Sequence, residues 1–261
     1  MSESKVIPVL ETKGLGISFG GLKANNDVNM VINPGELVGL IGPNGAGKTT
    51  FFNLITGVYQ PTEGTYYLNG EKMNGKVTHQ VVAAGIARTF QNIRLFKKMT
   101  VLENVKVAFN KDMKANLFQS ILRTPAFWKE ELEAERKALE LLSLFDLDKF
   151  ADQAAENLPY GQQRRLEIVR ALATDMKLLL LDEPAAGMNP TETESLLESI
   201  RMIREKFNIP ILLIEHDMNL VMNVCERIYV LNFGEILAEG TPDEISHNPE
   251  VIEAYLGKGA V

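Results

Sequence analysis

Short apolar runs recur along the chain, each bounded by Gly, Pro or acidic residues. They cover Glu36–Ile41, Leu178–Leu181, Ile211–Ile214 and Ile228–Leu231, and longer helix-like stretches lie between most of them. Apolar runs without polar alternation are typical of strands that are buried on both faces, as in a parallel sheet covered by helices. The pattern therefore predicts an α/β fold built on a parallel sheet.

The pattern near the N-terminus is different and indicates a small antiparallel sheet. The segment Thr65–Leu68 is followed by Asn69-Gly70, a dipeptide that favours the tight turn of a β-hairpin. Two further strand-like segments, Leu10–Phe19 and Val28–Ile32, precede this hairpin. We therefore expect an N-terminal antiparallel β subdomain in addition to the parallel sheet.

The middle of the chain has a helical pattern. Leu102–Leu147 carries no strand signal, and apolar residues within Glu130–Phe145 recur at nearly helical spacing. These residues are Leu132, Leu139, Leu142 and Phe145. We find no internal repeat and no low-complexity linker, so we interpret residues 1–261 as a single domain with a helical subdomain inserted at about residues 95–172.

Composition and charge limit the class of partner. The chain has 261 residues, of which 45% are hydrophobic and 23% charged, the balance of a folded globular protein. Its net charge of -7 and pI near 5.2 argue against a general nucleic-acid binder, because such binding depends mainly on Lys and Arg contacts to phosphate. No run approaches the roughly 18 apolar residues of a membrane span, so we expect a cytosolic protein. The single cysteine, Cys225, excludes an internal disulfide, and its apolar neighbours predict a small core residue.

One local segment is basic. Between Ile86 and Arg123, two acidic residues accompany eight basic ones: Arg88, Arg94, Lys97, Lys98, Lys106, Lys111, Lys114 and Arg123. Such runs usually form a solvated face. A local basic patch that binds nucleic acid is the alternative.

The segment "GPNGAGKT" matches the complete phosphate-binding loop pattern, and it follows an apolar run and precedes a helix-like stretch. Glycines allow successive backbone N–H groups to converge on a triphosphate, a lysine reaches the β- and γ-phosphates, and a threonine hydroxyl ligates Mg²⁺. The sequence thus predicts ATP and Mg²⁺ as cofactors, with Thr49 as a metal ligand. The predicted nucleotide-binding residues of this segment are Gly42, Pro43, Asn44, Gly45, Ala46, Gly47, Lys48, Thr49 and Thr50.

Two further apolar runs end in candidate catalytic residues. Asp182 and Glu183 follow "KLLLL", and His216 follows "PILLIE". Side chains at the carboxyl ends of parallel strands reach the crevice where such sheets bind ligands. Alone, these carboxylates suggest a solvated edge or helix cap, and a lone histidine is usually structural. With a phosphate loop in the same chain, we expect Asp182 to hold Mg²⁺, Glu183 to polarise the attacking water and His216 to contact the γ-phosphate.

The stretch "ENLPYGQQRRLEIVRAL" places Pro159, Tyr160 and Gly161 directly before a basic amphipathic helix. A helix N-terminus that begins at a glycine presents unpaired backbone N–H groups, which can hold an anion. An ordinary junction between a loop and a helix is the alternative.

The order of these motifs resembles the ATP-binding cassette family of transporter ATPases, over nearly the whole chain. After the phosphate loop come a glutamine in "ARTFQNIRLF" and then "LPYGQ", "LLLLDEP", "GMNP" and "EHD". The resemblance implies that Phe19 stacks on adenine and that Gln91 senses Mg²⁺ and the membrane subunits. It also implies that Leu158–Gln162 is the signature motif, in which Gly161 and Gln162 contact nucleotide.

The resemblance also implies a mechanism. Two such subunits close head to tail around two ATP molecules, and each signature motif completes the site on the opposite phosphate loop. Glu183 is then the general base, and His216 and Gln91 complete the catalytic set. Closure drives a pair of membrane subunits between inward-facing and outward-facing states.

The basic segment acquires a possible role in this arrangement. Arg94, Lys97 and Lys98 follow Gln91, where the family receives the coupling helices of its membrane subunits. The resemblance therefore implies that these cations face that interface or nearby anionic lipid.

A narrower resemblance is to the ATP-binding subunit of bacterial branched-chain amino acid importers. It rests on "RTFQNIRLFKKMTVLENV", "EPAAGMNPTET" and "AEGTPDEISHNPEVIEAYLG". It implies a peripheral protein on the cytoplasmic face of the cell membrane. The implied partners are two transmembrane permease subunits, a second ATP-binding subunit, identical or different, and an extracytoplasmic substrate-binding protein, with no nucleic acid.

Other members of the family remain alternatives. Urea and amide importers use similar subunits. Soluble cassette ATPases that act on DNA or ribosomes usually carry two fused cassettes or a long coiled-coil insertion, and the sequence has neither.

The chain departs from the family pattern at two places. Pro159-Tyr160 stands where the signature usually has Ser-Gly, and Asn189 stands where the loop after the carboxylates usually has Asp. Proline has neither a hydroxyl nor an N–H group. Since a hydrogen bond to a charged group is worth about 1.5 to 3 kcal/mol, we expect the site on the partner subunit to be weakened by roughly ten- to a hundredfold. Asn189 keeps the size of Asp without its negative charge.

Overall fold

The computed structural model describes residues 7–109 and 125–256, so Lys111, Lys114 and Arg123 of the basic segment lie outside it. The described chain forms two compact units. The first contains residues 7–88, 177–186 and 200–256, and the second contains residues 89–109, 125–176 and 187–199. None of the described helices has the length and apolar character needed to span a membrane.

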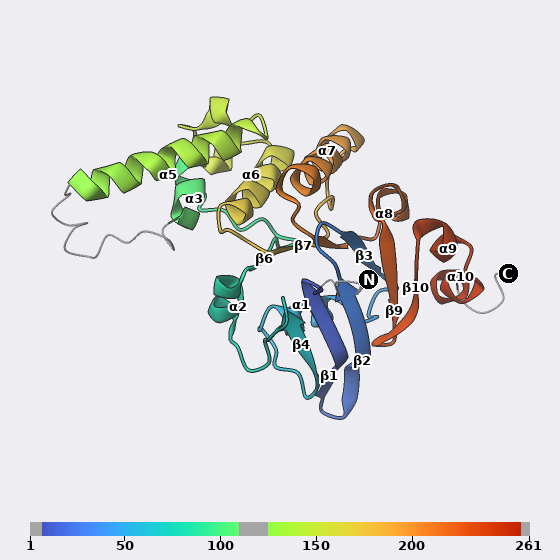
Figure 1. The fold of residues 1–261 in the computed structure, drawn as a ribbon. Helices are drawn as coiled ribbons and strands as arrows, with labels where there is room; N and C mark the ends of the chain where they lie inside the picture. Colours follow the sequence, from blue (N-terminus) through green and yellow to red (C-terminus); the bar gives the residue numbers. More distant parts are fainter. Residues whose placement is uncertain (1–6, 110–124, 257–261) are drawn as a thin grey trace, which may run out of the picture. The chain divides into compact units, whose positions relative to one another are not determined.

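A six-stranded sheet forms the centre of the first unit (Figure 1), with the strand order β10-β9-β3-β8-β7-β6. The strands are β3 (Leu37–Ile41), β6 (Ile86–Arg88), β7 (Leu178–Asp182), β8 (Ile211–Ile214), β9 (Arg227–Asn232) and β10 (Glu235–Gly240). All neighbours pair in parallel except β9 and β10, which pair antiparallel. Every residue of β3, β7 and β8 is buried, which explains their unbroken apolar runs. The predicted parallel sheet is confirmed.

The predicted antiparallel sheet is also present in the first unit, with the order β2-β1-β4-β5. Its strands are β1 (Leu10–Phe19), β2 (Leu22–Ile32), β4 (Glu63–Leu68) and β5 (Glu71–Lys72). Asn69 and Gly70 connect β4 to β5 with φ values of 49° and 80°, the left-handed pair that this tight turn requires. Strand β2 begins at Leu22, earlier than the predicted Val28, because its first half pairs with β1 in an irregular, bulged register that hides the alternation.

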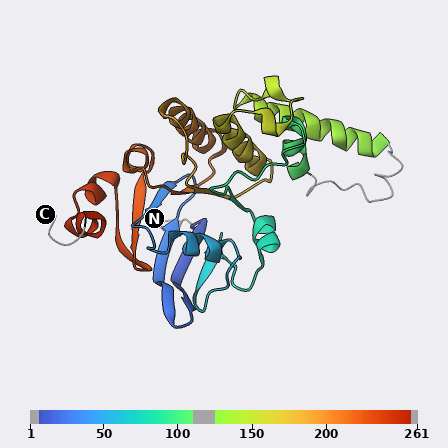
Figure 2. The same ribbon diagram turned by 180° about the vertical axis from the view of Figure 1, so that it is seen from behind.

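Helix α1 (Lys48–Ile55) shares one hydrophobic core with the two sheets of the first unit. Its Phe51, Phe52 and Ile55 are completely buried in a cluster with residues of both sheets. Figure 2 shows this unit from behind. The unit also contains α2 (Thr78–Ala84), the end of α7 (Pro190–Phe207), α8 (Met218–Val224), α9 (Pro242–Ser246) and α10 (Pro249–Leu256). Burial of the α1 side chains fixes the start of that helix, and therefore the loop before it, against the sheet.

The second unit is helical in its described part, as expected. It contains α3 (Val101–Phe109), α5 (Pro125–Ser143), the short 3₁₀ helices η1 (Asp148–Phe150) and η2 (Ala155–Asn157), α6 (Tyr160–Leu172) and the start of α7 (Pro190–Phe207). On α5, Ala138 and Leu142 are fully buried whereas Leu132 is 63% exposed. The face that packs therefore includes alanines, which the apolar spacing of the larger residues did not indicate.

Candidate functional site

The loop between β3 and α1 carries the predicted phosphate-binding residues, and its backbone needs glycine at two positions. A Cβ atom at Gly42 would lie 2.0 Å from the carbonyl oxygen of Leu231, and one at Gly47 would lie 2.6 Å from that of Ala24. Both glycines also have positive φ values, 151° and 104°, which side-chain-bearing residues rarely adopt. The glycines thus permit the close backbone packing that shapes the loop.

Lys48 lies across this loop. Its Nζ donates hydrogen bonds to the carbonyl oxygens of Gly42 at 2.6 Å and Pro43 at 3.0 Å. Burial lowers the pKa of this ammonium group, and the carboxylates of Glu183 and Asp182 oppose that shift. A cation that is removed from water and held beside free backbone N–H groups can bind an anion strongly.

Asp182 ends β7 and forms a buried ion pair with Arg88. The Arg88 Nη2 atom lies 2.6 Å from Asp182 Oδ2, and the two side chains are 7% and 9% exposed. Arg88 Nη1 also donates to Asn53 Oδ1 at 2.8 Å. We predicted Asp182 but not this partner. Both residues end a strand, Arg88 at the end of β6 and Asp182 at the end of β7. That shared position is the feature that could have indicated the pair.

Glu183 and His216 are brought together from the ends of β7 and β8. Glu183 Oε1 lies 2.7 Å from His216 Nε2, and the two side chains are 18% and 46% exposed. Glu183 has a φ of 46°, a left-handed conformation that costs of order 1 kcal/mol or more and is concentrated at functional sites. The carboxylate and the imidazole are therefore close enough to act on one small ligand.

Glu215, which precedes His216, was not predicted and supports the same loops. Its carboxylate accepts hydrogen bonds from the backbone N–H of Ala185 at 2.8 Å and of His216 at 3.2 Å. Burial raises the pKa of Glu215, and these two hydrogen bonds oppose the shift. Glu215 thereby ties the chain after Glu183 to the chain that carries the histidine.

A cavity of about 450 Å³ lies over the phosphate-binding loop. Its lining includes the predicted residues Asn44, Gly45, Ala46, Gly47, Lys48, Thr49, Thr50, Glu183 and His216, and also Leu22, Lys23, Ala24, Phe233 and Gly234. The predicted residues Gly42, Pro43 and Asp182 do not line the cavity. They interact with Lys48 instead: the carbonyl oxygens of Gly42 and Pro43 accept its hydrogen bonds, and the Asp182 charge raises its pKa. The structure therefore places an ammonium group, a hydroxyl group, a carboxylate and an imidazole around one cavity.

Phe19 is placed outside this lining. Its ring is 45% exposed and meets Tyr59 edge to face, with ring centroids 5.3 Å apart. The aromatic residue that lines the cavity is Phe233, which is 88% exposed and has a φ of 46°. No pattern in the sequence marked this turn residue.

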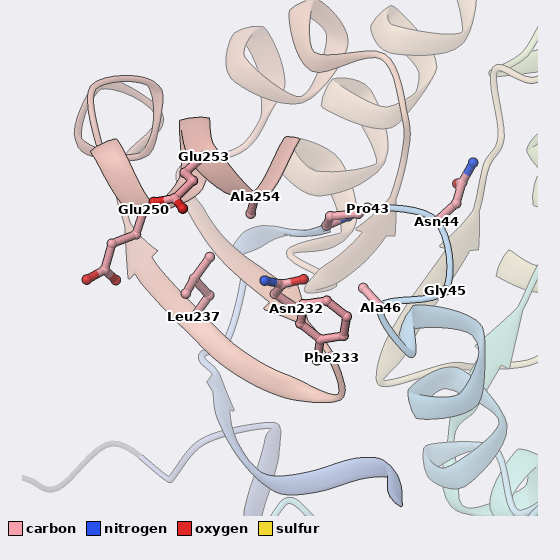
Figure 3. Close-up of a pocket in the computed structure, with 10 residues that line it drawn as sticks. All are labelled: Pro43, Asn44, Gly45, Ala46, Asn232, Phe233, Leu237, Glu250, Glu253 and Ala254. Carbon is pink, nitrogen blue, oxygen red and sulfur yellow. The ribbon is translucent and has the colours of Figure 1, made fainter. Parts of the chain in front are cut away.

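A second cavity of about 510 Å³ borders the same loop. Figure 3 shows Pro43, Asn44, Gly45 and Ala46 of the loop on one side and residues of β10 and α10 on the other. The α10 residues Glu250, Glu253 and Ala254 line this cavity together with the loop. Helix α10 and the phosphate-binding loop therefore form two walls of one cavity.

The remaining predicted residues belong to the second unit. Gly161 is buried in the first turn of α6, directly after Pro159 and Tyr160. The fully buried Arg164 of α6 pairs with Glu167 at 2.8 Å and donates to the Gln91 carbonyl oxygen at 3.0 Å. The predicted helix start is confirmed. The basic helix is anchored by a buried arginine, which its amphipathic pattern did not reveal. Gln162 lies next to Gly161 in the same turn.

The basic segment is not one solvated face. Arg94, Lys97 and Lys98 are exposed, as that interpretation requires. Lys98 pairs with Glu156 at 2.8 Å, and Lys106 pairs with Glu131. The prediction of a solvated face is wrong for Arg88, because its side chain is buried against Asp182.

Two family models match the chain. The model described as "ABC transporter" matches residues 25–186. The model described as "Branched-chain amino acid ATP-binding cassette transporter" matches residues 235–261, the segment that contains β10, α9 and α10.

Known proteins resemble the chain over almost its full length. The high-affinity branched-chain amino acid transport ATP-binding protein LivG of Escherichia coli is 51% identical over 96% of this chain and 98% of its own length. The crystal structure of the ADP conformation of MJ1267, an ATP-binding cassette of an ABC transporter, matches with a TM-score of 0.82 and 33% identity, covering 96% of this chain and 99% of MJ1267. A dimeric post-hydrolysis structure of the cassette MJ0796, bound to ADP and Pi, matches with a TM-score of 0.73 and 27% identity, covering 89% and 98%.

Proposed function

This chain belongs to the ATP-binding cassette transporter family, and from that premise we propose that it is the ATP-hydrolysing subunit of a branched-chain amino acid importer. The observation that carries the proposal is the close pair of Glu183 and His216 at a cavity lined by Lys48 and the phosphate-binding loop. The family match at residues 235–261 and the similarity to LivG support branched-chain amino acids as the transported substrates.

In this proposal, the loop residues Gly42–Thr50 bind the phosphates of ATP. Lys48 exchanges its contacts with the loop carbonyl oxygens for the phosphate oxygens, because an anion stabilises a buried ammonium group better than neutral carbonyls do. Phe19 stacks on adenine from the end of β1, where its ring is partly exposed. The nucleotide is thus held at both ends.

The metal proposal concerns Thr49, Asp182 and Gln91. A hydroxyl group, a carboxylate and an amide oxygen are the hard oxygen donors that Mg²⁺ prefers, usually together with phosphates and waters. When bound, the ion neutralises charge that develops on the phosphates. Thr49 lies on the cavity wall, and Asp182, whose charge acts on Lys48, ends β7 of the six-stranded sheet, so these donors fit the ion.

Hydrolysis is assigned to Glu183 as general base and to His216 as its partner. Glu183 accepts a proton from the attacking water, and the hydrogen bond to His216 orients the carboxylate. His216 contacts the γ-phosphate by donating a hydrogen bond from a ring N–H group. Gln91 completes the catalytic set in the complete assembly.

The assembly in this proposal contains a second ATP-binding subunit, two transmembrane permease subunits and an extracytoplasmic substrate-binding protein. The dimeric MJ0796 cassette supports the pairing of two cassettes. Gly161 and Gln162 of one subunit then face the nucleotide held by the other, and with Pro159 lacking an N–H the contact depends on Gly161 and the α6 N-terminus. The subunit works at the cytoplasmic face of the membrane. Its chain is one nucleotide-binding domain with an inserted helical subdomain.

The test is ATP hydrolysis by the purified protein, alone and with its membrane partners. Glu183→Gln removes the proposed base and keeps the side-chain size, so we expect turnover to fall by about 10²- to 10⁴-fold with ATP binding retained. Glu205→Gln is the matched control, because Glu205 is an exposed residue of α7. Undiminished turnover in Glu183→Gln would remove Glu183 from its assigned role.

A further inference from the structure

Arg88 holds the Asp182 carboxylate at the end of the sheet. Strand β6 pairs in parallel with β7, and Arg88 is in register with Leu180. Because both strands end at the same edge of the sheet, the long Arg88 side chain reaches Asp182 two residues further along β7. The 2.6 Å contact uses Asp182 Oδ2.

The same guanidinium is fixed on two other sides. Its Nη1 donates to Asn53 on α1 at 2.8 Å, and its Cζ atom lies 5.4 Å from the centre of the Phe52 ring. Helix α1 begins at Lys48 and includes Thr49. Arg88 therefore connects the carboxylate of β7 to the helix that carries the phosphate-binding lysine and threonine.

We propose that Arg88 is a positioning residue for the Mg²⁺ site: it fixes the Asp182 carboxylate through Oδ2, relative to α1, so that Oδ1 faces the metal. The inference rests on the proposed function, because it assigns Asp182 to the metal. Arg88 touches neither nucleotide nor metal in this role and acts through Asp182 alone.

Two effects of Arg88 on a bound cation oppose each other, and their balance makes the proposal testable. The positive charge of Arg88 repels a metal ion, so removing the charge alone would strengthen metal binding. The hydrogen bond from Nη2 holds Asp182 in one orientation, and the one from Nη1 to Asn53 fixes the guanidinium itself. Removing Arg88 therefore leaves a buried carboxylate without this partner and free to turn. If Arg88 is a positioning residue, the second effect dominates.

The experiment measures how strongly Mg²⁺ improves nucleotide binding. Isothermal titration calorimetry gives the Kd of the nonhydrolysable analogue AMP-PNP with Mg²⁺ and with EDTA, and the ratio of the two values is the metal coupling. For Arg88→Met we expect the coupling to fall about tenfold, the factor that corresponds to one charged hydrogen bond, while the affinity in EDTA stays unchanged. A merely structural role would change both affinities together or neither.

Three further variants support the interpretation. Arg88→Lys keeps the charge but reaches only one of the two partners, so we expect partial recovery of the coupling. Asn53→Ala leaves the ion pair and removes the hydrogen bond from Arg88 to α1, so we expect a two- to threefold loss of the coupling. This variant keeps the test valid if Arg88→Met does not fold. Arg227→Met is the matched control, because Arg227 also forms an ion pair at 2.8 Å, with Glu36, at the start of β9. We expect the metal coupling of this variant to equal that of the wild type.

The outcomes separate the inference from the proposed function. An unchanged or stronger metal coupling in a folded Arg88→Met variant overturns the positioning role and leaves the function intact. Failure of the wild-type protein to bind AMP-PNP with or without Mg²⁺ contradicts the proposed function itself.

Discussion

The thiol of Cys225 gives a residue-scale test of the core of the first unit. Burial raises its pKa to about 12, and the neighbouring Glu226 charge acts in the same direction. Since the thiolate is the reactive form, we expect no reaction of the folded protein with DTNB at pH 8 and complete reaction in guanidinium chloride. The measurement is the absorbance of the released thionitrobenzoate. Stoichiometric labelling of the folded protein at the rate of a free thiol would contradict the buried position.

Among single residues, those of the phosphate loop were the most predictable. Their spacing is local, and the glycines at 42 and 47 are required by contacts that only a Cβ-free residue tolerates. The proximity of Glu183 to His216 followed from strand ends of one parallel sheet. Arg88 and Glu215 were missed because their partners depend on which strands are neighbours, a long-range property that charge counting along the chain does not contain. The roles of all these residues remain predictions.

At the scale of single elements, the departure at Asn189 has a local explanation. Its Oδ1 accepts a hydrogen bond from the Glu192 backbone N–H at 3.0 Å, and its own N–H donates to Glu192 Oε2 at 3.0 Å. This reciprocal pair is a capping box at the start of α7. Asn189 therefore supplies a helix cap that Asp would also supply.

This cap predicts the stability of two variants. We expect Asn189→Ala to lower the free energy of unfolding by about 1 kcal/mol, the usual cost of a lost cap, as measured by urea unfolding followed by circular dichroism. Asn189→Asp keeps the acceptor and places a negative charge at a helix N-terminus, so its stability should equal or exceed that of the wild type. A loss of equal size in both variants would show that capping is not what Asn189 contributes.

The boundaries of helices and strands were predictable where burial on both faces leaves an unbroken apolar run. Strands β3, β7 and β8 are buried on both faces, and the predicted apolar runs match them almost residue for residue. The start of β2 was not predictable, because an irregular register with β1 breaks the alternation. On α5, buried alanines replace the expected larger residues on part of the packed face.

At the scale of the whole molecule, family membership follows from matches that span nearly the entire chain. In the proposal, other subunits of the assembly recognise the transported molecule. What this chain supplies in the proposal is the coupling of ATP hydrolysis to their movement, with the Glu183 carboxylate as the group on which hydrolysis depends.

The most direct test of the account is ATP-driven leucine uptake by the complete complex, reconstituted in proteoliposomes. With Mg²⁺ and ATP on the side of this subunit, the account predicts leucine accumulation by the wild-type complex and by Glu205→Gln. For Glu183→Gln it predicts at least a tenfold lower initial rate of uptake, with all subunits still assembled. Leucine uptake at the wild-type rate in an assembled Glu183→Gln complex, or uptake that needs no ATP, would contradict it.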